Sequence, residues 1–107
     1  MSNIHSTAYT ELQSMYDELQ SYLDSVLLGP ENEILLRQCE HLGDQIYRYN
    51  VAILEKNSKL HAIKQTSIIE LTKQAREAKE ALRKAEEQLK IFAQVAKTLD
   101  KILAQLG

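Results

Sequence analysis

The chain has 107 residues, of which 44% are hydrophobic and 26% are charged, and its formal net charge at pH 7 is −2. This length suits one domain, residues 1–107, and the composition is that of a folded chain, which excludes disorder throughout. The single cysteine excludes an internal disulfide framework and fits a reducing compartment. The sequence has no secretory signal and no apolar run of membrane-spanning length, so we expect a soluble, cytoplasmic protein.

Charge is distributed unevenly along the chain. Residues 1–55 contain nine acids and two bases, and residues 56–107 contain six acids and eleven bases, so the halves carry −7 and +5. Either these are two solvated faces of opposite sign, or the halves lie against each other, within one chain or between chains.

The first predicted helix spans about residues 6–28. Its apolar residues recur in alternating steps of four and three, which is the spacing of a helical heptad stripe. Gly29 and Pro30 then predict a turn, because glycine can take the left-handed conformation that closes a helix and proline fits the first turn of the next. So short a connection predicts an antiparallel hairpin. The stripe consists of Ala8, Leu12, Met15, Leu19, Tyr22 and Val26.

The second predicted helix spans about residues 30–56 and has the same spacing. Between residues 46 and 54 the remaining faces are apolar as well, which predicts a buried helix, with a strand as the alternative. Asn57 or Ser58 can cap a new helix, but no glycine or proline enforces a break, so a continuous helix stays open at this junction. The stripe consists of Leu35, Cys39, Leu42, Ile46, Tyr49 and Ile53.

Residues 58–106 are predicted to form one long helix, most clearly between Leu71 and Leu106. Such a helix would be about 73 Å long, whereas each hairpin helix would be about 38 Å. Half of its apolar stripe would lie uncovered, and a second copy of the chain or a different protein could cover it. We expect self-association, most simply as a two-fold dimer. The predicted self-association seam consists of Leu71, Ala75, Ala78, Leu82, Ala85, Leu89, Phe92, Ala96, Leu99, Leu103 and Leu106.

These elements predict an all-α fold of coiled-coil or helical-bundle type. It would consist of an antiparallel helical hairpin plus one long C-terminal helix, completed by oligomerisation.

Catalytic, cofactor and metal chemistry have no support in the sequence. It contains no Gly-x-Ser-x-Gly motif and no glycine-rich phosphate loop. Cys39 lies in a stripe and is predicted to be a buried structural thiol, and His5, His41 and His61 lack metal-ligand spacing. We therefore expect no enzyme, no cofactor and no metal site.

The tyrosines have two interpretations. They either rim the core of the chain, or Tyr9, Tyr16 and Tyr47 form a patch for a partner protein, because tyrosine is enriched at interfaces. The short basic stretch at residues 56–64 argues against nucleic-acid binding, and the absence of tryptophan argues against membrane-surface binding.

The sequence therefore predicts a non-enzymatic protein–protein interaction module, meaning a scaffold, adaptor or assembly subunit. It would self-associate through the long-helix seam and bind another protein. The alternative is a small cytosolic chaperone or inhibitor that sheathes a hydrophobic helix of its partner. Sedimentation separates the two, because the first predicts a stable dimer and the second a chain that orders only with its partner.

Overall fold

The heptad stripes of the sequence produce helices throughout the part of the chain that the structure describes. The structure is a computed structural model that describes residues 4–26 and 29–106. Every regular element in those residues is helical, so the all-α prediction is confirmed and the strand alternative at residues 46–54 is wrong. The elements are α1 (Ile4–Ser25), α2 (Pro30–Leu54), the 3₁₀ helix η1 (Ser58–Ala62), α3 (Gln65–Lys84) and α4 (Gln88–Leu106).

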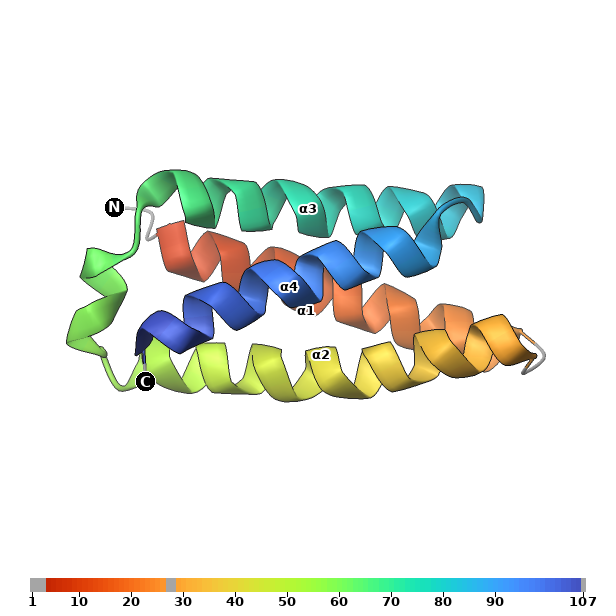
Figure 1. The fold of residues 1–107 in the computed structure, drawn as a ribbon, viewed down its shortest axis with the longest axis horizontal. Helices are drawn as coiled ribbons and strands as arrows, with labels where there is room; N and C mark the ends of the chain where they lie inside the picture. Colours follow the sequence, from red (N-terminus) through yellow and green to blue (C-terminus); the bar gives the residue numbers. More distant parts are fainter. Residues whose placement is uncertain (1–3, 27–28, 107) are drawn as a thin grey trace.

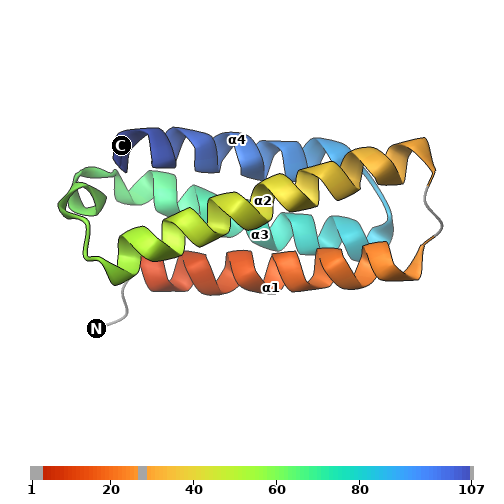
Figure 2. The ribbon, with the colours of Figure 1, turned by 90° about the horizontal axis from the view of Figure 1, so that it is seen from below.

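The α-helices form a bundle with extents of 43 × 22 × 19 Å. Successive helices run in opposite directions, so α1 begins and α4 ends at the end of the bundle where η1 lies (Figure 1). Both α1 and α4 pack against α2 and α3. The segment between α2 and α3 therefore crosses the end of the bundle, and α1 and α3 become neighbours that run in the same direction (Figure 2).

Ion pairs between α1 and α3 join the acidic and basic halves of the chain. The carboxylate of Glu11 lies 2.8 Å from Lys79 Nζ, and that of Glu18 lies 3.4 Å from the Arg83 guanidinium. Glu11 and Lys79 are the stronger pair, because both side chains are mostly buried and water screens them less. The two halves of opposite charge therefore lie against each other within one chain.

The predicted stripes of the hairpin face the core. In α1 the stripe shifts from the predicted Tyr22 to Leu23 at its last turn, and in α2 it shifts from Ile53 to Ala52. Tyr47 and Leu54 are 68% and 72% exposed, so the prediction that the helix is buried all round at residues 46–54 is wrong. The buried stripe residues are Ala8, Leu12, Met15, Leu19, Leu23, Leu35, Cys39, Leu42, Ile46, Tyr49 and Ala52.

The hairpin connection differs from its prediction in one respect. Gly29 has φ −113° and ψ 179°, so it is extended rather than left-handed, and it precedes α2 with Pro30 in the first helical turn. The helix predicted over residues 6–28 ends at Ser25, and residues 27–28 lie outside the described part of the chain.

The open question at residues 55–59 is settled in favour of a break. Lys56 has φ 53°, and the backbone N–H of Asn57 donates to the carbonyl of Ala52 at 3.0 Å, which closes α2. The Asn57 side chain accepts from the backbone N–H of Lys59 at 2.9 Å and so caps η1. Residue 58 therefore begins the short 3₁₀ helix η1, and the next α-helix begins at Gln65.

The prediction of one long helix over residues 58–106 is wrong, because the chain reverses at residues 85–87. Ala85 and Glu87 have φ values of 54° and 52°, and the N–H of Glu86 donates to the carbonyl of Ala81 at 3.2 Å. A left-handed non-glycine residue costs about 1–2 kcal/mol. Burial of one large side chain contributes about 1.5–3 kcal/mol, and the reversal buries several, Phe92 and Leu99 among them.

The reversal also removes the premise of the predicted dimer. Helices α3 and α4 have 20 and 19 residues, which is about 30 Å each, so the hairpin of α1 and α2 is long enough to cover them. The described helices bury most of the apolar stripe without a second chain.

Replacing Ala85 with Gly tests the reversal, because a turn and a continuous helix predict changes of opposite sign in the free energy of unfolding. Glycine adopts positive φ without steric cost, so Ala85→Gly should raise the free energy of unfolding by about 1 kcal/mol. In a continuous helix the same change would lower it by about 1 kcal/mol. The exposed Ala93 in α4 supplies the control, since Ala93→Gly should be destabilising. Urea unfolding measures both, and destabilisation by Ala85→Gly would contradict the reversal.

Candidate functional site

The predicted self-association seam lies mostly inside the bundle. Leu82, Leu89, Leu103 and Leu106 are only partly buried, and Ala85 is exposed in the turn. A side chain with no exposed surface cannot contact a second chain while the bundle stays closed. The buried members of the seam are Leu71, Ala75, Ala78, Phe92, Ala96 and Leu99.

The three tyrosines of the predicted partner patch come together on the opposite side of the hairpin from the core. Tyr9 and Tyr16 of α1 and Tyr47 of α2 line a hollow of about 450 Å³ between the two helices. A second hollow of about 270 Å³ shares Tyr16 and Glu40 with the first, so the two follow one line between α1 and α2. We call this pair of hollows the tyrosine groove; its other lining residues are Gln13, Gln20, Leu23, Asp24, Leu36, Cys39, Gly43, Asp44, Ile46 and Asn50.

Gly43 sets the depth of the tyrosine groove. A Cβ atom at this position would lie 2.9 Å from Tyr16 Oη and 3.1 Å from its ring, closer than van der Waals contact allows. Glycine inside a helix costs about 1 kcal/mol relative to alanine. In return, the Tyr16 ring lies directly on the backbone of α2 and forms a flat apolar floor.

Hydrogen bonds along α1 orient the polar tips of this surface. Tyr9 Oη donates to Gln13 Oε1 at 3.5 Å, and Gln13 Nε2 donates to Asp17 Oδ1 at 3.0 Å. Gln20 Nε2 donates to Tyr16 Oη at 3.3 Å. Tyr47, on the α2 side, is more than two-thirds exposed. The groove therefore offers aromatic surface with polar groups at its edge, which is the character of protein interfaces.

The electrostatic character of the tyrosine groove is acidic. Among the described residues that line its two hollows, the charged ones are Asp24, Glu40 and Asp44, all of one sign. Arg48 lies one turn beyond Asp44 and pairs with its carboxylate at 3.1 Å. A positively charged ligand group is thus favoured in the groove, and an anionic one is not.

The only cysteine of the chain lies beneath the groove and is unsuited to nucleophilic chemistry. Burial raises the pKa of the Cys39 thiol above its ordinary value, which keeps it protonated at neutral pH. Burial likewise raises the pKa of Tyr16, which is hydrogen-bonded to Cys39. Cys39 is therefore a free, buried thiol, and the prediction that it is buried is confirmed.

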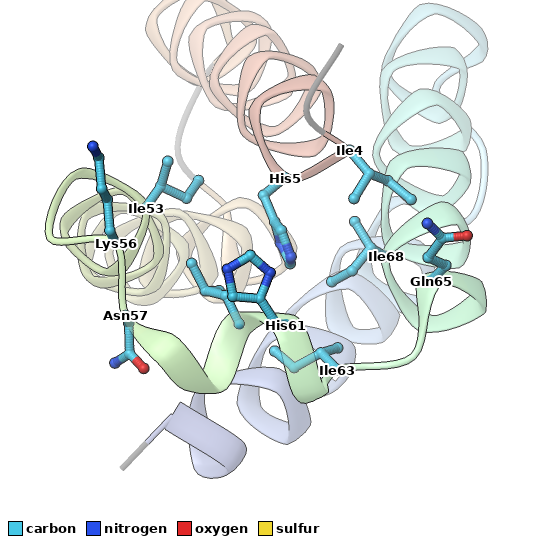
Figure 3. Close-up of a pocket in the computed structure, with 10 residues that line it drawn as sticks. Ile4, His5, Ile53, Lys56, Asn57, His61, Ile63, Gln65 and Ile68 are labelled. Atoms are coloured by element: carbon cyan, nitrogen blue, oxygen red, sulfur yellow. The ribbon is translucent and has the colours of Figure 1, made fainter. Parts of the chain in front are cut away.

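A pocket of about 650 Å³ opens at the end of the bundle where η1 lies. Figure 3 shows His5 from the start of α1 and His61 from η1 beside each other in this pocket, with isoleucines from several elements around them. Its wall includes Lys56, Asn57 and Gln65, and no described acid lines it. Leu60, Ile63 and Ile68 are buried beneath its surface.

His5 joins three elements in this pocket. Its Nδ1 lies 2.7 Å from the hydroxyl of Tyr49 in α2, and it also hydrogen-bonds the backbone of Leu60 in η1. Burial raises the pKa of Tyr49, so the hydroxyl stays protonated and donates to a neutral imidazole. Burial lowers the pKa of His5, and the neighbouring His61 lowers it further. His5 therefore holds η1 onto the bundle as a neutral side chain.

Sequence reasoning missed His5 and Gln45 as buried polar residues. His5 stands three positions before Ala8, in phase with the first stripe, so a signal existed. Gln45 is fully buried and donates to the carbonyl of Ala96 at 3.0 Å and to Asp100 at 2.7 Å. Its role depends on where α4 packs, which local sequence does not reveal.

The described part of the chain has no group of three or more His, Cys, Asp or Glu residues that could hold a metal ion. Within residues 4–26 and 29–106, none of the helices has both the length and the apolar character that crossing a membrane requires. The chain matches no protein-family model, no curated protein and no solved structure.

The pKa shift of His5 predicts acid sensitivity. An unfolded histidine titrates near pH 6.5, and the folded state resists that proton because the pKa of His5 is lowered. Stability should therefore fall as pH drops below about 6.5. The hydroxyl of Tyr49, the backbone of Leu60 and the side chain of His61 lie beside the ring; the hydrogen bond to Leu60 favours protonation of His5, but burial, the largest influence on its pKa, opposes it.

Replacing His5 with Asn should remove this sensitivity, because the amide can still accept from Tyr49 but does not titrate. Urea unfolding between about pH 7.5 and about pH 5.5, where carboxylates contribute little, measures the slope. His41→Asn is the control, since His41 is about half exposed. An unchanged slope in His5→Asn would rule out this origin of acid sensitivity.

Proposed function

We propose that this protein is a non-enzymatic protein–protein interaction module whose tyrosine groove binds a basic amphipathic helix of a partner protein. The observation that carries the proposal is the gathering of Tyr9, Tyr16 and Tyr47, from two helices, around hollows whose charged lining is acidic. A groove that runs along two packed helices commonly binds a third, amphipathic helix, whose apolar face packs into the groove.

The chemistry of the groove specifies both faces of that partner helix. Leu, Met or aromatic side chains would lie on the Tyr16 floor and between Tyr9 and Tyr47. Lysine or arginine side chains would flank them, within reach of Glu40, Asp44 and Asp24. Tyrosine faces add attraction for such cations beyond simple ion pairing.

The acids that remain for a partner are those not already paired with the basic half of the chain. Glu11 and Glu18 contact bases of α3, so they contribute little to the free surface. The carboxylates of the groove face away from α3 and α4, since they lie on the α1–α2 side of the bundle. The negative charge of residues 1–55 is thus divided between internal pairing and the proposed docking surface.

A designed peptide tests the proposal without knowledge of the natural partner. The probe is an amphipathic helix of about 18 residues with leucine on one face and lysine on the other. The peptide should bind the protein and perturb amide signals at the tyrosine groove in NMR titrations. Added salt should weaken this binding. The same peptide with glutamate in place of lysine should not bind.

Charge reversal in the groove should weaken that binding about tenfold, which is about 1.4 kcal/mol. The variant is Glu40→Lys with Asp44→Lys, and the matched control is Glu70→Lys with Glu77→Lys on exposed positions of α3. Both variants change net charge equally. Equal weakening by the two would mean that the peptide binds by general charge attraction, which contradicts a groove site.

A third peptide addresses the chaperone alternative. It carries glutamine in place of lysine, so it offers an apolar face without charge. A sheathing chaperone would bind this peptide as tightly as the basic one, and an interaction module of the proposed kind would not.

A further inference from the structure

The turn between α3 and α4 is made of residues that favour a helix. Ala85, Glu86 and Glu87 all have good helix propensity, and none is glycine, asparagine or proline. Nevertheless, Ala85 and Glu87 adopt positive φ, a region that disfavours any side chain with a Cβ atom. The closed turn is therefore held by the packing of α4 and not by its own residues.

The apolar register of α3 continues through this turn into α4. Ala78, Ala85 and Phe92 stand seven positions apart, and Leu82 and Leu89 follow the same interval. If the turn straightened, residues 65–106 would form one amphipathic helix with an uninterrupted stripe, about 63 Å long. A turn between two unrelated helices would have no reason to preserve this register.

Straightening would expose the face of α4 that now lies against α2 and α3, and it would leave its place in the bundle empty. That place is specific for α4. Gln45 is fully buried in α2, and its amide donates to Ala96 and Asp100 of α4. A generic apolar helix would offer a backbone carbonyl but no carboxylate, so one N–H of this amide would lose its partner, at a cost in affinity. A second copy of the chain supplies Ala96 and Asp100 in the right places.

We propose that two copies of this chain exchange α4, each straightening residues 65–106 into one helix that inserts into the other copy. In the bundle α4 runs antiparallel to α3. A two-fold axis across the middle of the long helices preserves that direction, because α4 of one copy then runs against α3 of the other. Strained hinge turns favour such exchange. The tyrosine groove lies on α1 and α2 and is unchanged by it, so this proposal does not depend on the proposed function.

Opposite substitutions at the hinge should shift the monomer–dimer equilibrium in opposite directions. Ala85→Leu favours the straight helix and should lower the dimer dissociation constant about tenfold or more. Ala85→Gly favours the turn and should raise it about tenfold or more. Ala93→Leu, at an exposed position within α4, is the control and should leave it unchanged. Sedimentation after equilibration near the unfolding temperature measures all three, because exchange requires α4 to leave its bundle.

A distance measurement distinguishes exchange from ordinary association. Spin labels are attached to the substitutions Glu77→Cys in α3 and Lys97→Cys in α4, both at exposed positions, and Cys39→Ala removes the native thiol. Labelled chains are then diluted with unlabelled ones. In the closed chain these helices are neighbours with axes about 10 Å apart. In an exchanged dimer the labelled positions on one chain would be about 30 Å apart.

Dimers that show the longer separation within one chain would support the exchange. Dimers that keep the short separation would overturn it, as would folded Ala85→Leu that stays monomeric at millimolar concentration. If Ala85→Leu fails to fold, the wild-type chain and Ala85→Gly at millimolar concentration provide the same comparison. Equal dimer fractions in those two would also overturn the proposal.

Discussion

The reversal of the chain at residues 85–87 is the constraint on which the rest of the bundle depends. Because α4 returns along α3, Phe92 and Leu99 enter the same core as Leu71 and Leu12. The described residues of a single chain thereby supply four α-helices of comparable length, which bury most of the apolar stripe. Two residues of the turn, Ala85 and Glu87, adopt unfavourable positive φ angles. The free energy that maintains the turn therefore comes from the packing of α4 in the core.

A second effect of the reversal is that the outer face of the hairpin stays free. Helices α3 and α4 cover one side of α1 and α2, and Tyr9, Tyr16 and Tyr47 lie on the other. Salt bridges with α3 neutralise part of the acidic half, and the acids of the groove remain at the surface. One side of the hairpin therefore packs against α3 and α4, and the other carries the acidic tyrosine groove.

Much of the helical core was predictable from the sequence, because steps of three and four identify the buried face of a helix. Leu12, Met15, Leu42 and Ile46 are examples, and all of them are buried as expected. Such steps are equally compatible with a straight helix and with two helices joined in register. The break at Asn57 left a visible signal in a capping side chain.

The break at Ala85 left no such signal, because backbone hydrogen bonds close that helix and any residue could supply them. The candidate site divides in the same way. The spacing of Tyr9 and Tyr16 placed both on one face of a helix, but the contribution of Tyr47 depends on how the hairpin is aligned. The contact of His5 with Tyr49, 44 positions away, depends on the whole bundle.

The segment between α2 and α3, which crosses the end of the bundle, has an electrostatic consequence because it makes α1 and α3 parallel neighbours. In a bundle where every neighbour is antiparallel, each helix dipole lies beside one that opposes it. Here α1 lies beside α3 with both positive ends at the η1 end, and such parallel dipoles repel each other. The salt bridges of Glu11 and Glu18 with α3 attract across that same boundary. They offset a repulsion that the path of the chain creates, and so the charge asymmetry of the sequence and the topology of the fold belong together.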